Sequence, residues 1–418
     1  MLKVLWFSNC ALSDSDISGT GTWIQSMAES LLSTNQVELG VIAFSDVIEF
    51  MRQDFCGISQ WLVPARKPIG KDGLPSRVLV REILSVCRQF KPDLVHVWGV
   101  ESFWGLLTAR KYITVPALLE IQGLKKTVAR YFMADLTFKE LLQCIGVKEI
   151  LKRKTLCSYK RDFTRWGRFE KEIICGHSFI DVQSGWISAH VKSMNPSAKQ
   201  FHVDLALRSS FYKALAWSNF KDERIKANFP YIFFSSSGAP PYKGIHVALR
   251  ILAELKPRYP ELRLHIAGHI QKKGIRQNGY VRWLSRLGKE LQIHDSIDWL
   301  GSLRADQIIK ELQLCELSLV CGFVESYCLA LAEPMYLGVP CVTSFTGGTS
   351  WIAENEKSAL FFLSGDVEYG AYQVERILLD PQIGLRLSTN SRNQGLMRHD
   401  VKSISDRQLD IYAKVMNC

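Results

Sequence analysis

Short apolar runs and longer amphipathic stretches alternate along the chain. LKVLWFS (2–8), PDLVHVWG (92–99), VPALLEIQG (115–123) and LRLHIAG (262–268) are apolar runs of strand length, and the segments between them leave room for helices. This alternation predicts an α/β chain whose strands form parallel sheets.

One strand–helix–strand unit stands out in the second half of the chain. LCELSLVCGFV (314–324) predicts a buried strand, LALAEPMYLG (329–338) a helix that closes on Gly338, and VPCVTS (339–344) the next strand. Pro334 lies inside this helix and removes one N–H, which costs roughly 3 kcal/mol beyond the first turn. We therefore expect the helix to begin late or to be kinked.

Two carboxylates, Glu325 and Glu333, lie eight positions apart in this unit. Ligands of parallel sheets bind outside the carboxyl ends of the strands, where helix N-termini attract phosphate. Amides around Tyr327, Cys328 and Leu329 are expected to hold a diphosphate, with Glu325 accepting from sugar hydroxyls and Glu333 from ribose hydroxyls. The alternative is a surface loop acid and a helix-face acid in an ordinary α/β domain.

This pattern resembles the Glu-x7-Glu signature of the retaining glycosyltransferases of family 4. The resemblance implies the GT-B fold, two Rossmann-like domains facing each other across a cleft. SSSGAPPYKGIHVALRILAELK (235–256) looks like the first strand, loop and helix of the donor domain, where a lysine before a glycine contacts the donor phosphates, the place of Lys243. Gly238 in this loop and Gly301, in a segment that borders the base pocket, join the expected donor contacts.

The chain departs from the family pattern at three points. An arginine usually precedes the lysine by four or five residues, and GAPP (238–241) stands there. Tyr327 and Cys328 replace the common Phe-Gly, and Pro334 replaces an alanine after Glu333. One phosphate-neutralising charge is therefore missing or comes from elsewhere.

The first half of the chain is expected to supply the acceptor side. Gly19 and Gly21 precede a helical pattern in a loop that would bring backbone close to acceptor and donor, although two glycines also fit a structural turn. Gln122 ends a predicted strand where many relatives have a histidine. It cannot act as a base but can hydrogen-bond, which suits a front-face displacement that depends on positioning. His96 is a second acceptor-side candidate, with a satisfied core histidine as the alternative.

Neither a metal nor a cofactor is expected. Asp14 and Asp16 form an Asp-x-Asp pair of the kind that binds divalent metal in the other large glycosyltransferase fold. They lie among serine and asparagine, where aspartates commonly serve turns and caps. The predicted second Rossmann-like domain also argues against that fold.

Composition fits a large enzyme of two domains. The chain has 418 residues, 47% of them hydrophobic. The boundaries expected are an N-terminal domain at 1–207, a linker at 208–228, a donor domain at 229–397 and a helix at 398–418 that returns to the first domain. Eleven cysteines lack C-x-x-C spacing, and neither a signal peptide nor a membrane span is apparent, so cytoplasm is the expected compartment.

The net charge of +11 is concentrated in part between residues 148 and 171, where nine Lys or Arg residues meet three acids and several aromatic residues. Such a segment can lie on an anionic membrane surface, where a lipid-linked glycan would be a natural acceptor. A solvated helix face is the alternative. A nucleic-acid site is disfavoured because no binding motif accompanies the charge.

The resemblance thus implies a retaining, metal-independent hexosyltransferase using a UDP- or GDP-sugar. Residues 168–212 look like the end of the N-terminal domain in bacterial surface-polysaccharide members, which suggests capsule, O-antigen or exopolysaccharide synthesis. Two alternatives remain: a sugar-nucleotide epimerase or phosphorylase-like enzyme, and an inactive GT-B binding subunit, which the missing arginine and histidine would favour.

Overall fold

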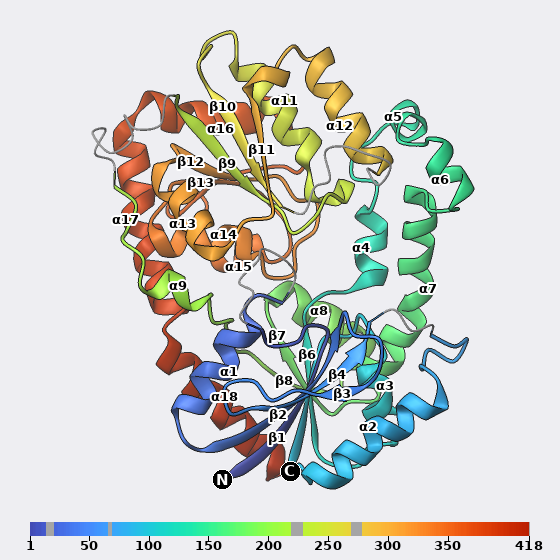
Figure 1. Cartoon of the computed structure of the whole chain (residues 1–418). Coiled ribbons are helices and arrows are strands. Elements are labelled where there is room, and N and C mark those ends of the chain that lie inside the picture. The colour runs from blue at the N-terminus through green and yellow to red at the C-terminus, as the bar shows by residue number, and fades with distance from the viewer. Residues whose placement is uncertain (14–20, 66–68, 219–228, 269–277, 418) are drawn as a thin grey trace.

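Two α/β domains lie one above the other in the computed structural model (Figure 1). The structure describes residues 1–13, 21–65, 69–218, 229–268 and 278–417. Each domain is built on one sheet, with helices packed on the sheet faces. The prediction of parallel α/β sheets is confirmed.

The N-terminal sheet has eight strands in the order β3-β4-β2-β1-β5-β6-β7-β8, and all pair in parallel except β3 with β4. Its central strand β1 is buried from Val4 onward, as expected of a strand covered on both faces. The bounds are β1 Leu2–Ser8, β2 Val37–Ser45, β3 Met51–Arg52, β4 Ser59–Pro64, β5 Leu94–Trp98, β6 Ala117–Ile121, β7 Phe179–Val182 and β8 Lys199–Phe201.

The C-terminal sheet has six parallel strands in the order β11-β10-β9-β12-β13-β14. The order reverses direction between β9 and β12, which is where open α/β sheets bind ligands. The bounds are β9 Tyr231–Ser235, β10 Arg263–Ala267, β11 Ile297–Gly301, β12 Leu317–Val320, β13 Cys341–Ser344 and β14 Leu360–Phe362.

Helices connect most of the strands. Those before the second sheet are α1 Ile24–Ser33, α2 Arg77–Phe90, α3 Trp104–Ala109, α4 Lys125–Tyr131, α5 Phe138–Gln143, α6 Val147–Leu151, α7 Leu156–Cys175, α8 Gly185–Met194 and α9 Ser209–Tyr212. The helices that follow β9, the first strand of the second sheet in the chain, are η1 Pro241–Lys243, α11 Ile245–Leu255, α12 Gly279–Glu290, η2 His294–Ser296, α13 Ala305–Leu314, α14 Leu329–Leu337, α15 Thr349–Ile352, α16 Val367–Leu379, α17 Pro381–Arg398 and α18 Val401–Met416.

The unit expected around the two glutamates forms as β12, α14 and β13. Helix α14 begins at Leu329, ends at Gly338 with φ +81°, and contains Pro334. The expectation of a late start is therefore wrong.

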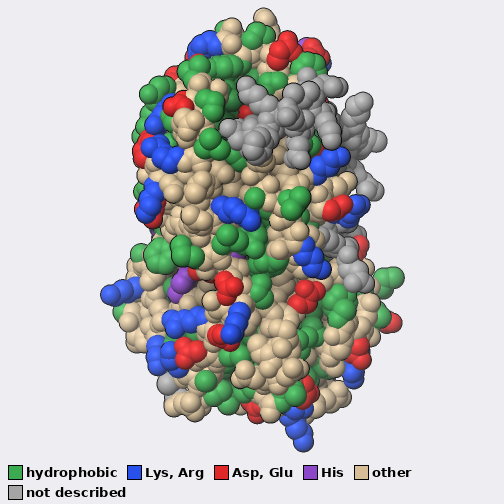
Figure 2. Space-filling view, turned by 90° about the vertical axis from the view of Figure 1, so that its left-hand side faces the viewer, with side chains coloured by type: hydrophobic (Ala, Val, Ile, Leu, Met, Phe, Trp, Pro, Cys, Tyr) green, Lys and Arg blue, Asp and Glu red, His purple; other side chains and the backbone are tan. Residues whose placement is uncertain are grey.

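The last two helices run along one side of the molecule from the C-terminal domain to the N-terminal one (Figure 1). Helix α17 packs on α14, and α18 packs on α1 and β6. Tyr412 of α18 accepts a hydrogen bond from Trp6 Nε1 at 3.0 Å. The space-filling view of this side shows acidic, basic and apolar side chains interspersed (Figure 2).

A helical arm, residues 125–175 with α4 to α7, rises from the N-terminal domain on the opposite side (Figure 1). Helices α4 and α7 pack against each other, and α5 reaches α12 of the C-terminal domain. Trp283 Nε1 donates to Gln143 Oε1 at 3.0 Å across this contact. The arm is thus a second connection between the domains.

Candidate functional site

A cavity of about 370 Å³ lies between the two domains and is lined by residues of both. Its charged lining residues are three carboxylates and three cations, namely Glu101, Glu325, Glu333, Lys125, Arg208 and Lys243. Charged groups of both signs gathered in one cavity can serve both phosphate and sugar hydroxyls.

Lys243 and Glu325 meet in this cavity. Lys243 Nζ lies 2.7 Å from Glu325 Oε1 and 3.0 Å from Oε2. Lys243 ends η1, and Gly244 follows it at φ +72° with space for no side chain, because a Cβ would lie 1.9 Å from the carbonyl oxygen of Cys321. Glycine at 244 therefore lets the loop approach β12 and carry the lysine to Glu325.

The environment keeps Lys243 charged. Burial lowers the pKa of Lys243, but the neighbouring Glu325 and Tyr242 raise it by more, so that the pKa lies above its ordinary value. An ammonium group at this position offers three donors to an anionic ligand.

The N-terminus of α14 opens on the cavity beside this pair, because Cys328, Leu329 and Ala330 line it. The first N–H groups of a helix have no intrahelical acceptor. Cys328 caps the helix with φ +87°, a backbone conformation that favours glycine. Cysteine thus occupies the position at which the family pattern has glycine. The Tyr327 hydroxyl donates to Asp204 Oδ1 at 3.0 Å.

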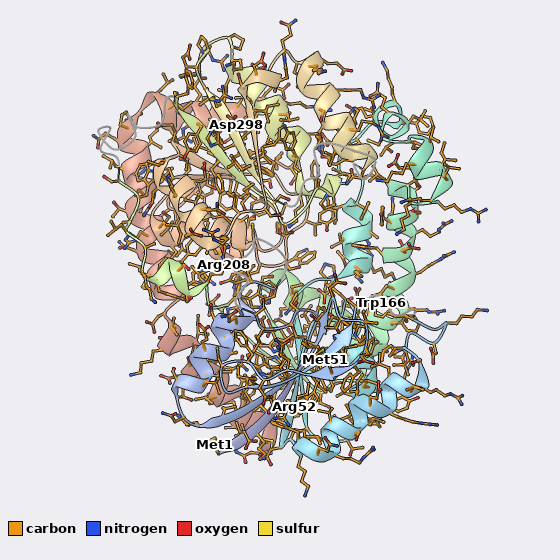
Figure 3. All side chains as sticks on the ribbon, in the orientation of Figure 1. Met1, Met51, Arg52, Trp166, Arg208 and Asp298 are labelled. Atoms are coloured by element: carbon orange, nitrogen blue, oxygen red, sulfur yellow. The ribbon has the colours of Figure 1, made fainter. Side chains whose placement is uncertain are left out.

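Glu333 is paired with Arg208. The guanidinium lies 2.8 Å from Glu333 Oε1 through Nη2 and 3.0 Å through Nε, and both residues are buried. Arg208 Nη1 is buried without a hydrogen-bond partner among the described residues. Figure 3 labels Arg208 at the level between the two domains. No sequence pattern singled out this arginine beyond its place at the start of the linker expected at 208–228.

Gln122 enters the cavity from the N-terminal domain, together with two residues that the sequence analysis missed. Glu101 lies close to Gln122, because a Cβ on Gly99 would meet both Glu101 Oε2 and Gln122 Oε1. Burial raises the pKa of Glu101 to about 7, although backbone N–H groups and Lys125 partly oppose it. Lys125 donates to the carbonyl oxygen of Glu101 at 2.5 Å. Glu101 could have been noticed as the first carboxylate after a predicted strand.

Three of the expected glycines do not line the cavity. Gly21 forms a turn at φ +84° before α1, Gly238 accepts from the Ser236 hydroxyl, and Gly301 ends β11 at φ +74°. Gly21 thus fits the structural-turn alternative. Gly19, Asp14 and Asp16 lie outside the described residues.

His96 is not an acceptor-side residue. It is fully buried, and its Nδ1 lies 2.8 Å from the Tyr412 hydroxyl of α18. Burial lowers its pKa to about 3. The side chain faces the returning helix rather than the cavity. His96 is thus a core histidine that is satisfied at Nδ1 only, because Nε2 is buried without a hydrogen-bond partner among the described residues.

The described part of the chain contains neither a metal-binding cluster nor a membrane-spanning helix. No group of three or more His, Cys, Asp and Glu side chains there is arranged to hold a metal ion. Among the same residues, every helix falls short of the length and apolarity that a membrane span requires.

Residues 217–394 match the family model described as Glycosyl transferases group 1. An uncharacterized glycosyltransferase, YqgM, from Bacillus subtilis is 28% identical over 184 residues, 44% of this chain and 49% of that protein. N-acetyl-alpha-D-glucosaminyl L-malate synthase from Bacillus anthracis is 26% identical over 131 residues, 31% of this chain and 34% of that protein. The chain thus spans about half the length of these relatives or less.

Solved structures match over the whole chain. Sucrose-phosphate synthase from Thermosynechococcus elongatus superposes with a TM-score of 0.77 at 16% identity, covering 100% of both chains. Anabaena HepE in complex with UDP and glucose gives a TM-score of 0.69 at 15% identity, covering 99% of this chain and 100% of that one. The family model confirms the resemblance to glycosyltransferases over residues 217–394, and the solved structures confirm the GT-B fold.

Proposed function

From a C-terminal domain that matches the group 1 glycosyl transferases, we propose that the chain transfers a sugar from a nucleotide-sugar donor to a saccharide acceptor. The observation that carries this proposal is the Lys243–Glu325 pair beside the N-terminus of α14, inside a cavity lined by both domains. A cation and free helix amides bind a diphosphate, while a carboxylate binds sugar hydroxyls.

Two cations serve the diphosphate in this proposal. Lys243 provides the first, and Arg208 provides the second in place of the arginine missing from residues 238–241. Support for Arg208 comes from its buried position in the cavity lining and from the unpartnered Nη1. A buried donor without an acceptor is costly, and a phosphate oxygen would relieve that cost.

In this proposal, two carboxylates accept hydrogen bonds from hydroxyl groups of the donor. Glu325 accepts from the sugar to be transferred and Glu333 from the ribose, as the resemblance implies. Both carboxylates are held by cations in the structure. Donor binding therefore exchanges ion pairs within the protein for contacts with the ligand.

Gln122 and Glu101 form the acceptor side. The acceptor oxygen bonds to the anomeric carbon as the bond from that carbon to the diphosphate breaks, and the acceptor proton passes to the leaving phosphate oxygen. Gln122 positions the acceptor hydroxyl and Glu101 accepts a hydrogen bond from the acceptor. We propose retention of configuration by this front-face route without a metal.

We also propose the chemical nature of the donor and of the acceptor. The donor is a UDP- or GDP-sugar, and the acceptor is a lipid-linked saccharide of surface-polysaccharide synthesis. The names of the relatives that resemble this chain point to different products, and the donor is the first property to be measured.

A donor panel tests the function. We would add UDP- and GDP-sugars to the purified chain, with and without chelator, and measure nucleotide release and thermal shift for wild type, Lys243→Ala and Glu325→Ala. One donor should stabilise the wild type and release its nucleotide, with at least a 100-fold loss of release in both variants because each removes a charged contact to the donor.

Lys310→Ala and Glu368→Ala are the matched controls, since both residues are exposed in the C-terminal domain. They should behave as wild type. Binding of a donor without release, even with saccharide acceptors present, would favour the inactive binding subunit. Dependence on added metal would contradict the metal-independent route.

A further inference from the structure

The tip of the helical arm, residues 138–154, exposes a cluster of large apolar side chains. Phe138 and Leu142 of α5 are 77% and 52% exposed, and Val147 and Leu151 of α6 are 74% and 78% exposed. Residues four apart share one face of a helix. Each of the two short helices therefore turns an apolar face to solvent. Isolated apolar residues are common on surfaces, but a cluster marks an interaction site.

The acidic side chains near the tip all point the other way, toward the C-terminal domain. Asp135 meets His246 at 2.5 Å, Glu140 meets Arg250 at 2.6 Å and Glu149 meets Arg282 at 3.0 Å. These are all the acids between residues 135 and 155. The C-terminal domain thus neutralises the negative charge of this segment.

The basic side chains stay on the outer surface. Lys139, Lys152, Arg153 and Lys154 are exposed, and none has an ion-pair partner within the part of the chain that the structure describes. The tip therefore presents apolar helix faces bordered by unneutralised cations. That combination is complementary to an anionic surface with an apolar interior.

Two aromatic residues of the basic segment, Phe163 and Trp166, do not belong to this surface. Trp166 of α7, labelled in Figure 3, donates to the Val100 carbonyl at 2.7 Å, and Phe163 lines the cavity. These two rings therefore face the protein and add nothing to the exposed surface of the tip. The exposed apolar groups of that surface lie on α5 and α6, which precede both rings in the chain.

We propose that the arm tip docks the protein on an anionic lipid bilayer, with the apolar faces of α5 and α6 at headgroup depth and the cations on lipid phosphates. The arm begins at the cavity, because Lys125 and Val128 of α4 line it. A bilayer at the tip would hold a lipid-linked acceptor near the acceptor side. This role in presenting an acceptor rests on the proposed function, but bilayer binding itself does not require catalysis.

Vesicle co-sedimentation tests the docking. The full chain is mixed with vesicles of phosphatidylcholine alone and with vesicles containing phosphatidylglycerol. Binding should require phosphatidylglycerol and weaken as salt rises. Absence of binding to the anionic vesicles would overturn the proposal.

Two triple variants locate the contact. Replacing the exposed cations Lys152, Arg153 and Lys154 by serine should weaken binding by roughly 100-fold, since each basic residue near an anionic surface contributes about fivefold. Replacing the apolar residues by serine should weaken it at least tenfold. The apolar variant is Leu142→Ser, Ile150→Ser and Leu151→Ser, in which Ile150 is a further exposed residue of α6, at 63%.

Matched triple variants elsewhere serve as controls and should bind like wild type. The apolar control is Ile48→Ser, Leu215→Ser and Leu379→Ser, and the basic control is Arg77→Ser, Lys192→Ser and Lys402→Ser, all at exposed positions. Equal losses in tip and control variants would show nonspecific adsorption and overturn the proposal. Self-association of wild type that disappears in the apolar tip variant would assign the surface to a second copy instead.

Thermal unfolding and the donor-induced thermal shift separate the two proposals. Tip variants should keep both, because their substitutions lie outside the cavity. Vesicle binding without any donor response would uphold the docking surface and reject the transferase function. Donor response without vesicle binding would do the reverse.

Discussion

At the residue scale, the cavity balances its own charges. Lys243 neutralises Glu325, Arg208 neutralises Glu333, and Lys125 lies near Glu101. A carboxylate placed in a low-dielectric cavity without a cation would shift its pKa strongly upward. Glu101 shows this effect, because Lys125 hydrogen-bonds to its backbone carbonyl oxygen rather than to its carboxylate and only partly opposes the effect of burial on the pKa of Glu101.

Glu101 should make stability depend on pH. Its folded pKa, raised by burial to about 7, lies above the ordinary value of 4.5. The stability that this shift contributes is fully present below about pH 4.5 and is lost as the pH rises through 7. Glu101→Gln removes the buried charge and with it this pH dependence. The free energy of unfolding of the variant minus that of wild type should therefore be about 1–3 kcal/mol larger at pH 8 than at pH 5.

Urea unfolding at pH 5 and pH 8 measures this difference. The exposed Glu368→Gln is the matched control and should show the same offset from wild type at both values. The same offset for Glu101→Gln at both pH values would mean that the Glu101 carboxyl is solvated in the native state.

At the element scale, the start of α14 sets the geometry of the donor site. Leu329 begins the helix directly after Cys328, whose left-handed backbone turns the chain from the Glu325 loop into the helix. The proline at 334 is accommodated further along, so the helix N-terminus stays at the cavity. The strain of this turn is therefore located at Cys328.

Glycine should be preferred over alanine at position 328, against the usual order. Both substitutions remove the buried thiol, but only glycine relieves the positive φ. We expect Cys328→Gly to be more stable than Cys328→Ala by about 1 kcal/mol, as measured by urea unfolding. At a helical position with negative φ, such as exposed Ser403, alanine should be the more stable of the same pair. An alanine preference at 328 as well would show that the turn carries no strain.

The sequence predicted strands and helix ends wherever neighbouring residues determine them. The apolar runs predicted β12 and β13, and Gly338 predicted the end of α14, because strands and helix caps depend on nearby residues. Arg208 and Glu101 were missed because each reaches the cavity only through tertiary folding. His96 was misplaced for the same reason: its partner Tyr412 lies 316 residues away. The positive φ of Cys328 was likewise invisible, since cysteine does not signal a left-handed turn.

At the scale of the whole molecule, three connections set how the two domains face the cavity. They are the linker that carries Arg208, the helical arm that meets α12, and the α17–α18 pair that returns to the first sheet. The Arg208–Glu333 ion pair holds the first connection. Three carboxylates of the arm that pair with side chains of α11 and α12 hold the second, together with the Gln143–Trp283 hydrogen bond. The third depends on buried packing, in which Tyr412 is fully buried.

Tyr412→Phe tests the third connection. The phenol hydroxyl is buried and accepts from Trp6 Nε1 at 3.0 Å, and it lies 2.8 Å from His96 Nδ1. Because burial holds the pKa of His96 near 3, the neutral imidazole needs the hydroxyl as its donor. Phenylalanine would leave two buried nitrogens unpaired and should lower the free energy of unfolding by about 1–3 kcal/mol.

The loss of stability in Tyr412→Phe should appear first in α18, where the two domains are joined. In hydrogen exchange, α18 should lose protection in Tyr412→Phe while α11, inside the C-terminal domain, keeps its own. The half-exposed Tyr372 provides the control, and Tyr372→Phe should change neither helix. If α11 loses as much protection as α18, the domains open together and the returning helix is part of one cooperative unit. Sugar transfer, for which we propose acceptor contacts from Gln122 and donor contacts from Lys243 in the opposite domain, would then weaken in step with global stability rather than with the loosening of α18 alone.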